Sequence, residues 1–339
     1  MKRIVIAGAR GFFGSMVMER LRADGDVPVA ASRRTAGDVR LDVEDRASIR
    51  AVLRAGDVVV DATAPFQTRT TALIEEALAI GFDVVDLCDN LSYARRVAAL
   101  EHPARARGIR VVNCCSSVSV LSALALRCSN LHEPASIHGF LAPATRHTAN
   151  RGVADSFLSS VGRTIEVWRG GAWQQTRGWA ESREFQSLGR IGRVIETADS
   201  FTLPRAFPSL RTSDFWVDPN TRGAGPLLAV ASRLPAVVPM LSMVVRYGGS
   251  LARQLGSDSG LLAYEMKGTD GDRATVIFRG PDSFVMAAIP AALAAEQLAA
   301  GTLERERDGV IPPDALTRGD ALLEALERNG IQIEKLCGP

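Results

Sequence analysis

The sequence predicts an α/β protein with a doubly wound parallel sheet and a second α+β domain built on a mostly antiparallel sheet. Three observations predict it. Short apolar runs alternate with helical segments over the first third of the chain. A glycine-rich turn joins the first apolar run to the first helical segment. Beyond about residue 127, strand-like runs follow one another, which is typical of antiparallel pairing.

The first domain is predicted to contain five parallel strands with helices between them. The strands are expected at 2–7, 27–32, 56–62, 83–86 and 109–113. The helices are expected at 15–21, 46–54, 68–80 and 92–107, with Asp45 as the N-cap of the second. In such a sheet the ligand crevice lies at the carboxyl ends of the strands, so the residues that follow each strand are the site candidates.

The turn after the first strand has glycines three residues apart, at Gly8, Gly11 and Gly14. In a Rossmann-type domain such glycines allow a sharp exit from the strand, close approach to a pyrophosphate and tight packing of helix on strand. The amides at the start of the helix face the phosphates. We therefore predict that this turn binds a dinucleotide, together with Arg10, Phe12 and Phe13. The alternative for a glycine triplet alone is a packed turn without a ligand.

The end of the second strand favours NADP(H) over NAD. NAD-binding sheets place an Asp or Glu about 20 residues beyond the glycines, to bind the ribose hydroxyls. No carboxylate occurs at 30–36, where Ser32, Arg33 and Arg34 suit a 2′-phosphate instead. We expect NADP(H), with NAD as the alternative, and Asp42 at the adenine end. The competing interpretation is that the two arginines are only solvated.

The residues after the third strand are expected to line the nicotinamide side of the site. Small side chains followed by proline let the chain turn there, and the segment consists of Thr63, Ala64, Pro65 and Phe66.

Two groups of residues are candidates for the catalytic acid. Asp86 and Asp89 follow the fourth strand and could protonate or polarise an imine or carbonyl, whereas the alternative is capping of the next turn. His147 follows Arg146 in the loop 143–151. There the histidine could supply a proton and the arginine could hold a substrate carboxylate, whereas the alternative is a solvated polar loop. The other histidines, His102, His132 and His138, are weaker candidates.

The sequence lacks the residue patterns that several other enzyme mechanisms require. None of the three tyrosines has a lysine four residues on, as short-chain dehydrogenases require, and no G-x-S-x-G elbow is present. The five cysteines show no metal-ligand spacing, so we expect no metal and reduced thiols in the cytoplasm. A net charge of +2 gives no ground for a nucleic-acid partner.

The second domain is predicted to extend over 127–283, after a first domain of 1–126. Its strands are expected at 135–141, 164–168, 172–176, 193–197, 261–267 and 274–279, with a hairpin at Gly170 and Gly171. Its helices are expected at 153–161 and 226–254. Helices at 284–300 and 317–329 are expected to bring the segment 284–339 back to the first domain.

The most apolar stretch, 227–245, is interrupted by two prolines. A spanning helix needs about 20 mostly uncharged residues, so this stretch predicts core or interface helices and not a membrane span. We expect a homodimer. Contact with a membrane surface is the disfavoured alternative.

In order along the chain, these features resemble the saccharopine dehydrogenase-like (saccharopine reductase-like) oxidoreductases. The resemblance rests on the glycine turn at 8–14, the strand and turn at 59–66, the Gly-x-x-Tyr-Val-Asp-like segment at 81–87, and the tail at 309–313. It is densest before residue 120. It implies an NAD(P)-dependent reductase or dehydrogenase whose second domain closes over a small-molecule substrate. The chain departs from many members at 117–120, where it lacks a Pro-Gly turn.

Taken together, the sequence predicts an NADP(H)-dependent oxidoreductase. Hydride would pass to or from a C=N, C=O or C=C bond of a small metabolite. The alternative is a catalytically silent NADP-binding regulatory or sensor protein, which would keep the glycine turn and lack the acid.

Overall fold

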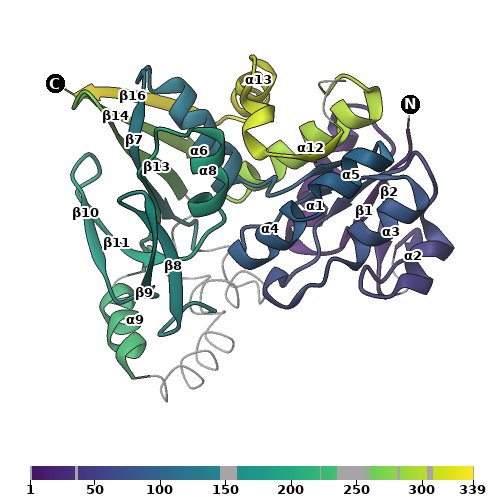
Figure 1. The fold of residues 1–339 in the computed structure, drawn as a ribbon, viewed down its shortest axis with the longest axis horizontal. Coiled ribbons are helices and arrows are strands. Elements are labelled where there is room, and N and C mark those ends of the chain that lie inside the picture. The colour runs from purple at the N-terminus through teal and green to yellow at the C-terminus, as the bar shows by residue number, and fades with distance from the viewer. Residues whose placement is uncertain are drawn as a thin grey trace. The chain divides into compact units, whose positions relative to one another are not determined.

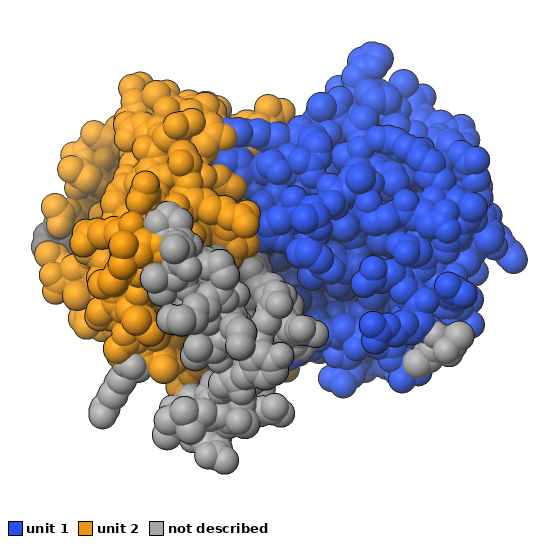
Figure 2. Space-filling view, turned by 90° about the horizontal axis from the view of Figure 1, so that it is seen from below, with its two compact units in different colours: residues 1–121, 285–325 blue, residues 122–284, 326–339 orange. Residues whose placement is uncertain are grey.

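The computed structural model describes residues 2–34, 37–145, 159–221, 223–234, 257, 260–280, 283–303 and 308–338. The chain forms two compact units (Figure 2). Unit 1 comprises 1–121 and 285–325, and unit 2 comprises 122–284 and 326–339.

Unit 1 is built on a seven-stranded sheet in which every neighbouring pair is parallel (Figure 1). Its order is β15-β6-β5-β4-β1-β2-β3. The strands are β1 (Ile4–Ala7), β2 (Val29–Ser32), β3 (Val39–Arg40), β4 (Val58–Asp61), β5 (Asp83–Asp86), β6 (Arg110–Val112) and β15 (Gly309–Ile311). The predicted doubly wound parallel sheet is confirmed, and β15 joins its edge from a distant part of the chain.

The helices of unit 1 follow the strands with small differences from the prediction. They are α1 (Phe12–Ala23), α2 (Arg46–Val52), α3 (Ala72–Ile80), α4 (Leu91–Ala98), α5 (Glu101–Arg107) and α12 (Val285–Ala300), with short 3₁₀ turns η1 (Phe66–Thr68) and η3 (Pro313–Thr317). The single helix expected at 92–107 is in fact α4 and α5. Asp45 caps α2 as predicted, because its Oδ1 accepts from the Ala47 amide at 2.9 Å.

Right-handed crossovers place these helices on both faces of the sheet. The connection from β1 to β2 runs across the sheet in the opposite direction to the connection from β4 to β5. Since both are right-handed, α1 and α3 cover opposite faces. Within the described residues α12 packs with α1, whereas α3 packs with α2 and α5.

Unit 2 is built on a nine-stranded sheet in which β7 and β12 are the one parallel pair of the described strands. The main path is β10-β11-β12-β7-β13-β14-β16, and β8 pairs with both β12 and β9. The strands are β7 (Pro134–Ala142), β8 (Thr164–Arg169), β9 (Ala172–Arg177), β10 (Ser182–Phe185), β11 (Arg190–Ile195), β12 (Thr212–Val217), β13 (Gly260–Gly268), β14 (Arg273–Gly280) and β16 (Gln332–Gly338). The predicted antiparallel character and the glycine hairpin between β8 and β9 are confirmed, whereas β10, β12 and β16 were not predicted.

Two helices lie wholly within unit 2, α8 (Asp199–Ala206) and α9 (Ala224–Arg233), while α6 (Ser117–Cys128) and α13 (Ala321–Arg328) each cross the boundary between the units. On one face of the unit 2 sheet, Trp216, Phe140, Ala263 and Ile277 are cross-strand neighbours in a buried apolar row. This row anchors the sheet.

The tail differs from the prediction that 284–339 returns as a whole to the first domain. Residues 285–325 belong to unit 1, but 326–339 belong to unit 2. The reason is that β16 pairs with the edge of β14 over seven residue pairs, which satisfies backbone groups that the edge would otherwise leave open. The first segment of unit 1 ends at residue 121, within α6.

Within the apolar stretch 227–245, residues 227–233 belong to α9. The expected helix at 153–161 and the continuation of 226–254 beyond residue 234 lie almost entirely outside the described residues. No helix among the described residues is long and apolar enough to cross a membrane.

Candidate functional site

The glycine turn of unit 1 is as tight as a phosphate-binding turn requires. Gly8 has a φ of +78°, in the left-handed region, and its carbonyl accepts from the Gly11 amide at 2.7 Å. A Cβ at Gly14 would lie 2.1 Å from the Gly8 carbonyl oxygen, so no other residue fits there without moving the turn. Helix α1 begins directly after Gly11 without a side-chain cap. Its positive end therefore lies at the predicted dinucleotide site, where Arg10 is exposed.

The end of β2 presents positive charge. Arg33 and Arg34 are exposed, and neither side chain is paired with a described residue. The Ser32 hydroxyl donates to the Arg34 carbonyl. Asp38 follows β2 in the chain, and its Oδ2 accepts from the Ala30 amide at 2.8 Å. One oxygen of this carboxylate is therefore bound to the backbone of β2.

Three other predicted cofactor residues lie nearby in unit 1. The rings of Phe12 and Phe13 pack edge to face with centroids 5.2 Å apart. Asp42 is half-buried, and its Oδ1 accepts from the Glu44 amide at 3.1 Å. Asp42 therefore shapes the turn before α2 and still exposes part of its carboxylate.

A buried ion pair shapes the loop after β4. Asp61 is fully buried, and its Oδ2 lies 2.7 Å from Nη2 of Arg69, whose side chain is 6% exposed. Burial acts to lower the pKa of Arg69, but the charge and hydrogen bonds of Asp61 raise it above its usual value. The Thr63 amide also donates to Asp61, at 3.0 Å. Asp61 and Arg69 thus bracket the predicted nicotinamide-side segment from Thr63 to Phe66, in which the Ala64–Pro65 peptide is cis.

Sequence reasoning missed this role of Arg69. The residue was assigned to the start of the helix predicted at 68–80, whereas α3 begins at residue 72. The available signal was Asp61, because a charge at the end of a run of buried valines requires a partner.

Asp86 lies at the end of β5, as predicted, and is fully buried. Its Oδ1 accepts from the amides of Cys88 at 3.1 Å and Cys114 at 3.0 Å, and its Oδ2 accepts from Nδ2 of Asn113 at 2.8 Å. Burial raises the pKa of Asp86 to about 6. In the structure this carboxyl ties the loop after β5 to the loop after β6. Its role as an acid stays a prediction.

Asp89 is half-buried, and burial raises its pKa. It does not cap α4, because Asn90 does so by accepting from the Tyr93 amide at 2.9 Å. Asp89 is therefore less buried than Asp86, and its pKa lies above the usual value for an aspartate. Arg146 and His147, the other predicted catalytic residues, lie outside the described residues.

Two serine hydroxyls that follow β6 were not predicted to belong to the site. Ser116 and Ser119 are buried, and the hydroxyl of each lacks a hydrogen-bond partner among the described residues. Buried hydroxyls are normally satisfied, so these two are expected to bind an ordered water or a ligand.

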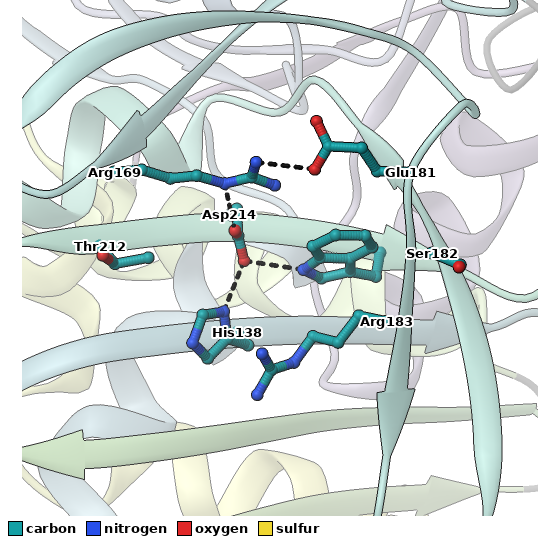
Figure 3. Close-up of a pocket in the computed structure, with 8 residues that line it drawn as sticks. His138, Arg169, Glu181, Ser182, Arg183, Thr212 and Asp214 are labelled. Atoms are coloured by element: carbon teal, nitrogen blue, oxygen red, sulfur yellow. Dashed lines mark hydrogen bonds and ion pairs between the residues drawn. The ribbon is translucent and has the colours of Figure 1, made fainter.

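Unit 2 contains a separate pocket of about 340 Å³, drawn in Figure 3. At its centre Asp214 is nearly fully buried and accepts from three donors: Nδ1 of His138 at 2.7 Å, Nε1 of Trp216 at 2.7 Å and Nε of Arg169 at 2.8 Å. Burial alone would raise the pKa of Asp214, but His138 and Arg169 hold it below its usual range. Because an ionised carboxylate only accepts, Nδ1 of His138 carries the proton.

Sequence reasoning ranked His138 low and did not name Asp214. The two residues are 76 positions apart and meet because β7 pairs with β12, a strand that was not predicted.

The cysteines and acidic groups do not form a metal centre in the described part of the chain. No group of three or more His, Cys, Asp or Glu residues there could hold a metal ion. Cys88 and Cys115 are buried, and burial raises their thiol pKa values well above the usual range, which disfavours thiolate chemistry.

Comparison with known proteins agrees with this architecture. The model of the NAD dependent epimerase/dehydratase family matches residues 4–134. The apo saccharopine dehydrogenase (L-Glu forming) from Saccharomyces cerevisiae matches over 100% of both chains, with a TM-score of 0.64 and 15% sequence identity. This chain has the fold of saccharopine dehydrogenase.

The saccharopine dehydrogenase fold confirms the expected architecture, and at this identity it shows the fold alone. A meso-dapdh variant from Clostridium tetani, solved with DAP, matches 97% of this chain at 14% identity with a TM-score of 0.46. No curated protein matches the chain. Residues 4–134 are thus similar to a family described as NAD dependent, and the whole chain has the fold of a dehydrogenase.

Proposed function

We propose that this protein is an NADP(H)-dependent oxidoreductase that transfers a hydride to or from a C=N, C=O or C=C bond of a small metabolite. The observation that carries the proposal is the approach of Gly14 to the Gly8 carbonyl, where a Cβ would lie 2.1 Å from the oxygen. In a sheet of Rossmann order, this close packing of α1 on the turn puts the amides at the start of α1 where a diphosphate would bind.

The residues present fit a phosphorylated dinucleotide. When bound, the nicotinamide supplies the hydride chemistry. The turn from Gly8 to Gly14 would bind the diphosphate, and Arg33 and Arg34 would bind the 2′-phosphate by charge-assisted hydrogen bonds. The Ser116 and Ser119 hydroxyls, which are buried without a partner among the described residues, would bind a polar group at the carboxyl end of β6.

For the proton we propose Asp89 ahead of Asp86. A proton donor must come within hydrogen-bond reach of the substrate. Asp86 is fully buried and occupied by three donors, so it would position the two loops. Asp89 is half-buried, and its raised pKa favours keeping a proton closer to neutral pH. His147 and Arg146 stay proposed for the same step and for holding a substrate carboxylate.

Calorimetric titration with NADP+ and NAD+ tests the cofactor assignment. Each charge-assisted hydrogen bond contributes about 1.5–3 kcal/mol, so Arg33→Gln/Arg34→Gln should weaken NADP+ binding at least ~10-fold and leave NAD+ binding nearly unchanged. Gly14→Ala should weaken both. Arg54→Gln, an exposed arginine elsewhere in unit 1, is the matched control and should change neither. Absence of binding by the unmodified protein at millimolar NADP+ would overturn the proposal.

A second candidate function is an NADP-binding sensor without turnover. It is favoured by one observation, the full occupation of Asp86 by loop donors. Turnover separates the two functions. An oxidoreductase consumes NADPH with some carbonyl, imine or enoyl acceptor, and Asp89→Asn slows that consumption. A sensor binds NADP+ equally well but consumes no NADPH with any acceptor.

A further inference from the structure

The pocket of unit 2 interrupts an apolar sheet face with a row of polar residues. Asp214 on β12, His138 on β7 and Glu265 on β13 are cross-strand neighbours. Two residues further along the same strands lies the buried apolar row that contains Phe140 and Trp216. Buried polar groups are costly beside such a core unless their hydrogen bonds are complete, so the hydrogen bonds of this row indicate what the pocket is built to hold.

The two carboxylates that line the pocket, Asp214 and Glu181, and the neighbouring Glu265 of the polar row all have donors. Asp214 accepts from three of them. Glu181 accepts from Nη1 of Arg169 at 2.8 Å and from Thr176. Glu265 accepts from Nη2 of Arg183 at 3.2 Å and from the Ser187 hydroxyl at 3.0 Å. Each of these carboxylates therefore accepts from at least two donors within the protein, and the Glu181 side chain remains 40% exposed.

Two of the donors are not committed. Nη2 of Arg169 and Nε of Arg183 are buried and have no hydrogen-bond partner among the described residues. The two side chains line the pocket and are 21% and 33% exposed, whereas these two nitrogen atoms are themselves buried. A buried guanidinium N–H with no acceptor in the protein is normally satisfied by an ordered water or by a ligand, and an oxyanion is the ligand that suits it best.

The rest of the lining suits the same kind of ligand. The hydroxyl-bearing residues Thr212 and Ser182 also line the pocket. Figure 3 shows Arg169 and Arg183 extending from different strands into the region around Asp214 and His138. Since Asp214 holds Nδ1 of His138, the Nε2 edge of this ring is the one left for a ligand, and Nε2 donates to an oxyanion when the ring is doubly protonated.

We propose that this pocket is a binding site for an oxyanion, the carboxylate or phosphate of a small ligand, held by the guanidinium groups of Arg169 and Arg183 beside His138. The site lies within unit 2 and is independent of the dinucleotide site proposed in unit 1. Glu181 and Glu265 hold the two guanidinium groups in place, and Asp214 orients both Arg169 and His138.

The test is titration of the full chain with succinate and, separately, with inorganic phosphate, at ionic strength held constant with sodium chloride. Calorimetry gives the affinity, and the ring resonances of His138 report contact with the ligand. We expect saturable binding at millimolar concentration or below and a shift of the His138 resonances. Tighter binding of succinate would identify a carboxylate ligand, and tighter binding of phosphate would identify a phosphate ligand.

Variants assign the binding to this pocket. Arg183→Gln should weaken binding at least ~10-fold, because a charge-assisted hydrogen bond is lost. Arg183→Lys keeps the charge and the ion pair with Glu265 but loses the planar fork, so a loss of several-fold is expected in a variant that keeps its fold. Arg273→Gln, an exposed arginine on β14 of the same sheet, should change nothing.

Two outcomes would overturn the proposal: no saturable binding of either probe, or equal binding by Arg183→Gln and Arg273→Gln. Phosphate bound at the glycine turn of unit 1 would not depend on Arg183. Loss of NADP+ binding in unit 1 would leave the Arg183-dependent binding intact, so the two proposals fail separately.

Discussion

Removal of Arg69 should destabilise unit 1 strongly. The guanidinium of Arg69 neutralises Asp61, which is fully buried at the end of β4. Nη2 of Arg69 lies 2.7 Å from Oδ2 of Asp61. Arg69→Gln leaves this carboxylate buried without its counter-charge. Breaking a buried ion pair from one side costs about 3–5 kcal/mol, because the remaining charge has lost its partner and cannot reach water.

An exposed pair in the same unit sets the scale. Arg105 pairs with Glu101 on α5, and the Arg105 side chain is 69% exposed. Exposed pairs contribute about 0–1 kcal/mol, so Arg105→Gln should change the free energy of unfolding by less than about 1 kcal/mol. The difference between the free-energy losses of Arg69→Gln and Arg105→Gln therefore measures the effect of burial.

The double variant Asp61→Asn/Arg69→Gln tests the cause. It removes both charges, so it should be more stable than Arg69→Gln alone although it carries one more substitution. This result would show that the uncompensated carboxylate, and not the loss of the arginine's packing, is responsible for the destabilisation.

Urea unfolding followed by circular dichroism measures these free energies. All four tryptophans lie in unit 2, at positions 168, 173, 179 and 216, so fluorescence follows that unit separately. Arg69→Gln should shift the transition seen by circular dichroism more than the one seen by fluorescence. Two results would contradict this reasoning. One is that Arg69→Gln lowers the free energy of unfolding by no more than Arg105→Gln does. The other is that the loss in the double variant equals the sum of the losses in Asp61→Asn and Arg69→Gln.

Three further predictions concern stability in unit 1. The pKa of Asp86 is raised to about 6, so stability should fall by about 3 kcal/mol as pH rises from about 4 to 6, and Asp86→Asn should lose this slope in urea titrations at several pH values. Burial, with Asp24 close by, raises the pKa of Glu296 to about 7, so stability falls between about pH 4.5 and 7. Glu296→Gln should therefore be more stable than the unmodified protein at pH 8 by about 1–2 kcal/mol in thermal unfolding, with no gain at pH 4. Asp45→Ala removes the N-cap of α2 and should cost about 0.5–2 kcal/mol, whereas Asp45→Asn should cost less.

The parallel sheet could be predicted from sequence because its signals are local. Each central strand is a run of apolar residues between turn residues, and the strand expected at 83–86 coincides with β5. The edge strand β15 could not be predicted in this way. It has three residues, and its pairing with β6 joins segments about 200 positions apart that no local pattern relates.

The turn at Gly8 was predictable for the same reason, whereas the pocket of unit 2 was not. Glycine spacing is visible in the sequence, and the structure shows the close contact that requires it. The contact between His138 and Asp214 depends instead on which strands pair and on their register, because a shift of one residue would move each side chain to the opposite face. Alternating polarity can suggest that one residue points outward, but it does not identify its neighbour.

The ends of β4 and β5 show what sequence can and cannot specify about charge. Asp61 and Asp86 each close a run of valines, and the register places them side by side on neighbouring strands. Two adjacent buried carboxylates cannot both be ionised without compensation. The protein satisfies this constraint in two ways: Arg69 neutralises Asp61, while Asp86 receives three hydrogen bonds and has a pKa of about 6. The positions follow from the strand pattern, but the charges depend on Arg69 and Asn113, whose side chains reach these carboxylates only in the folded structure.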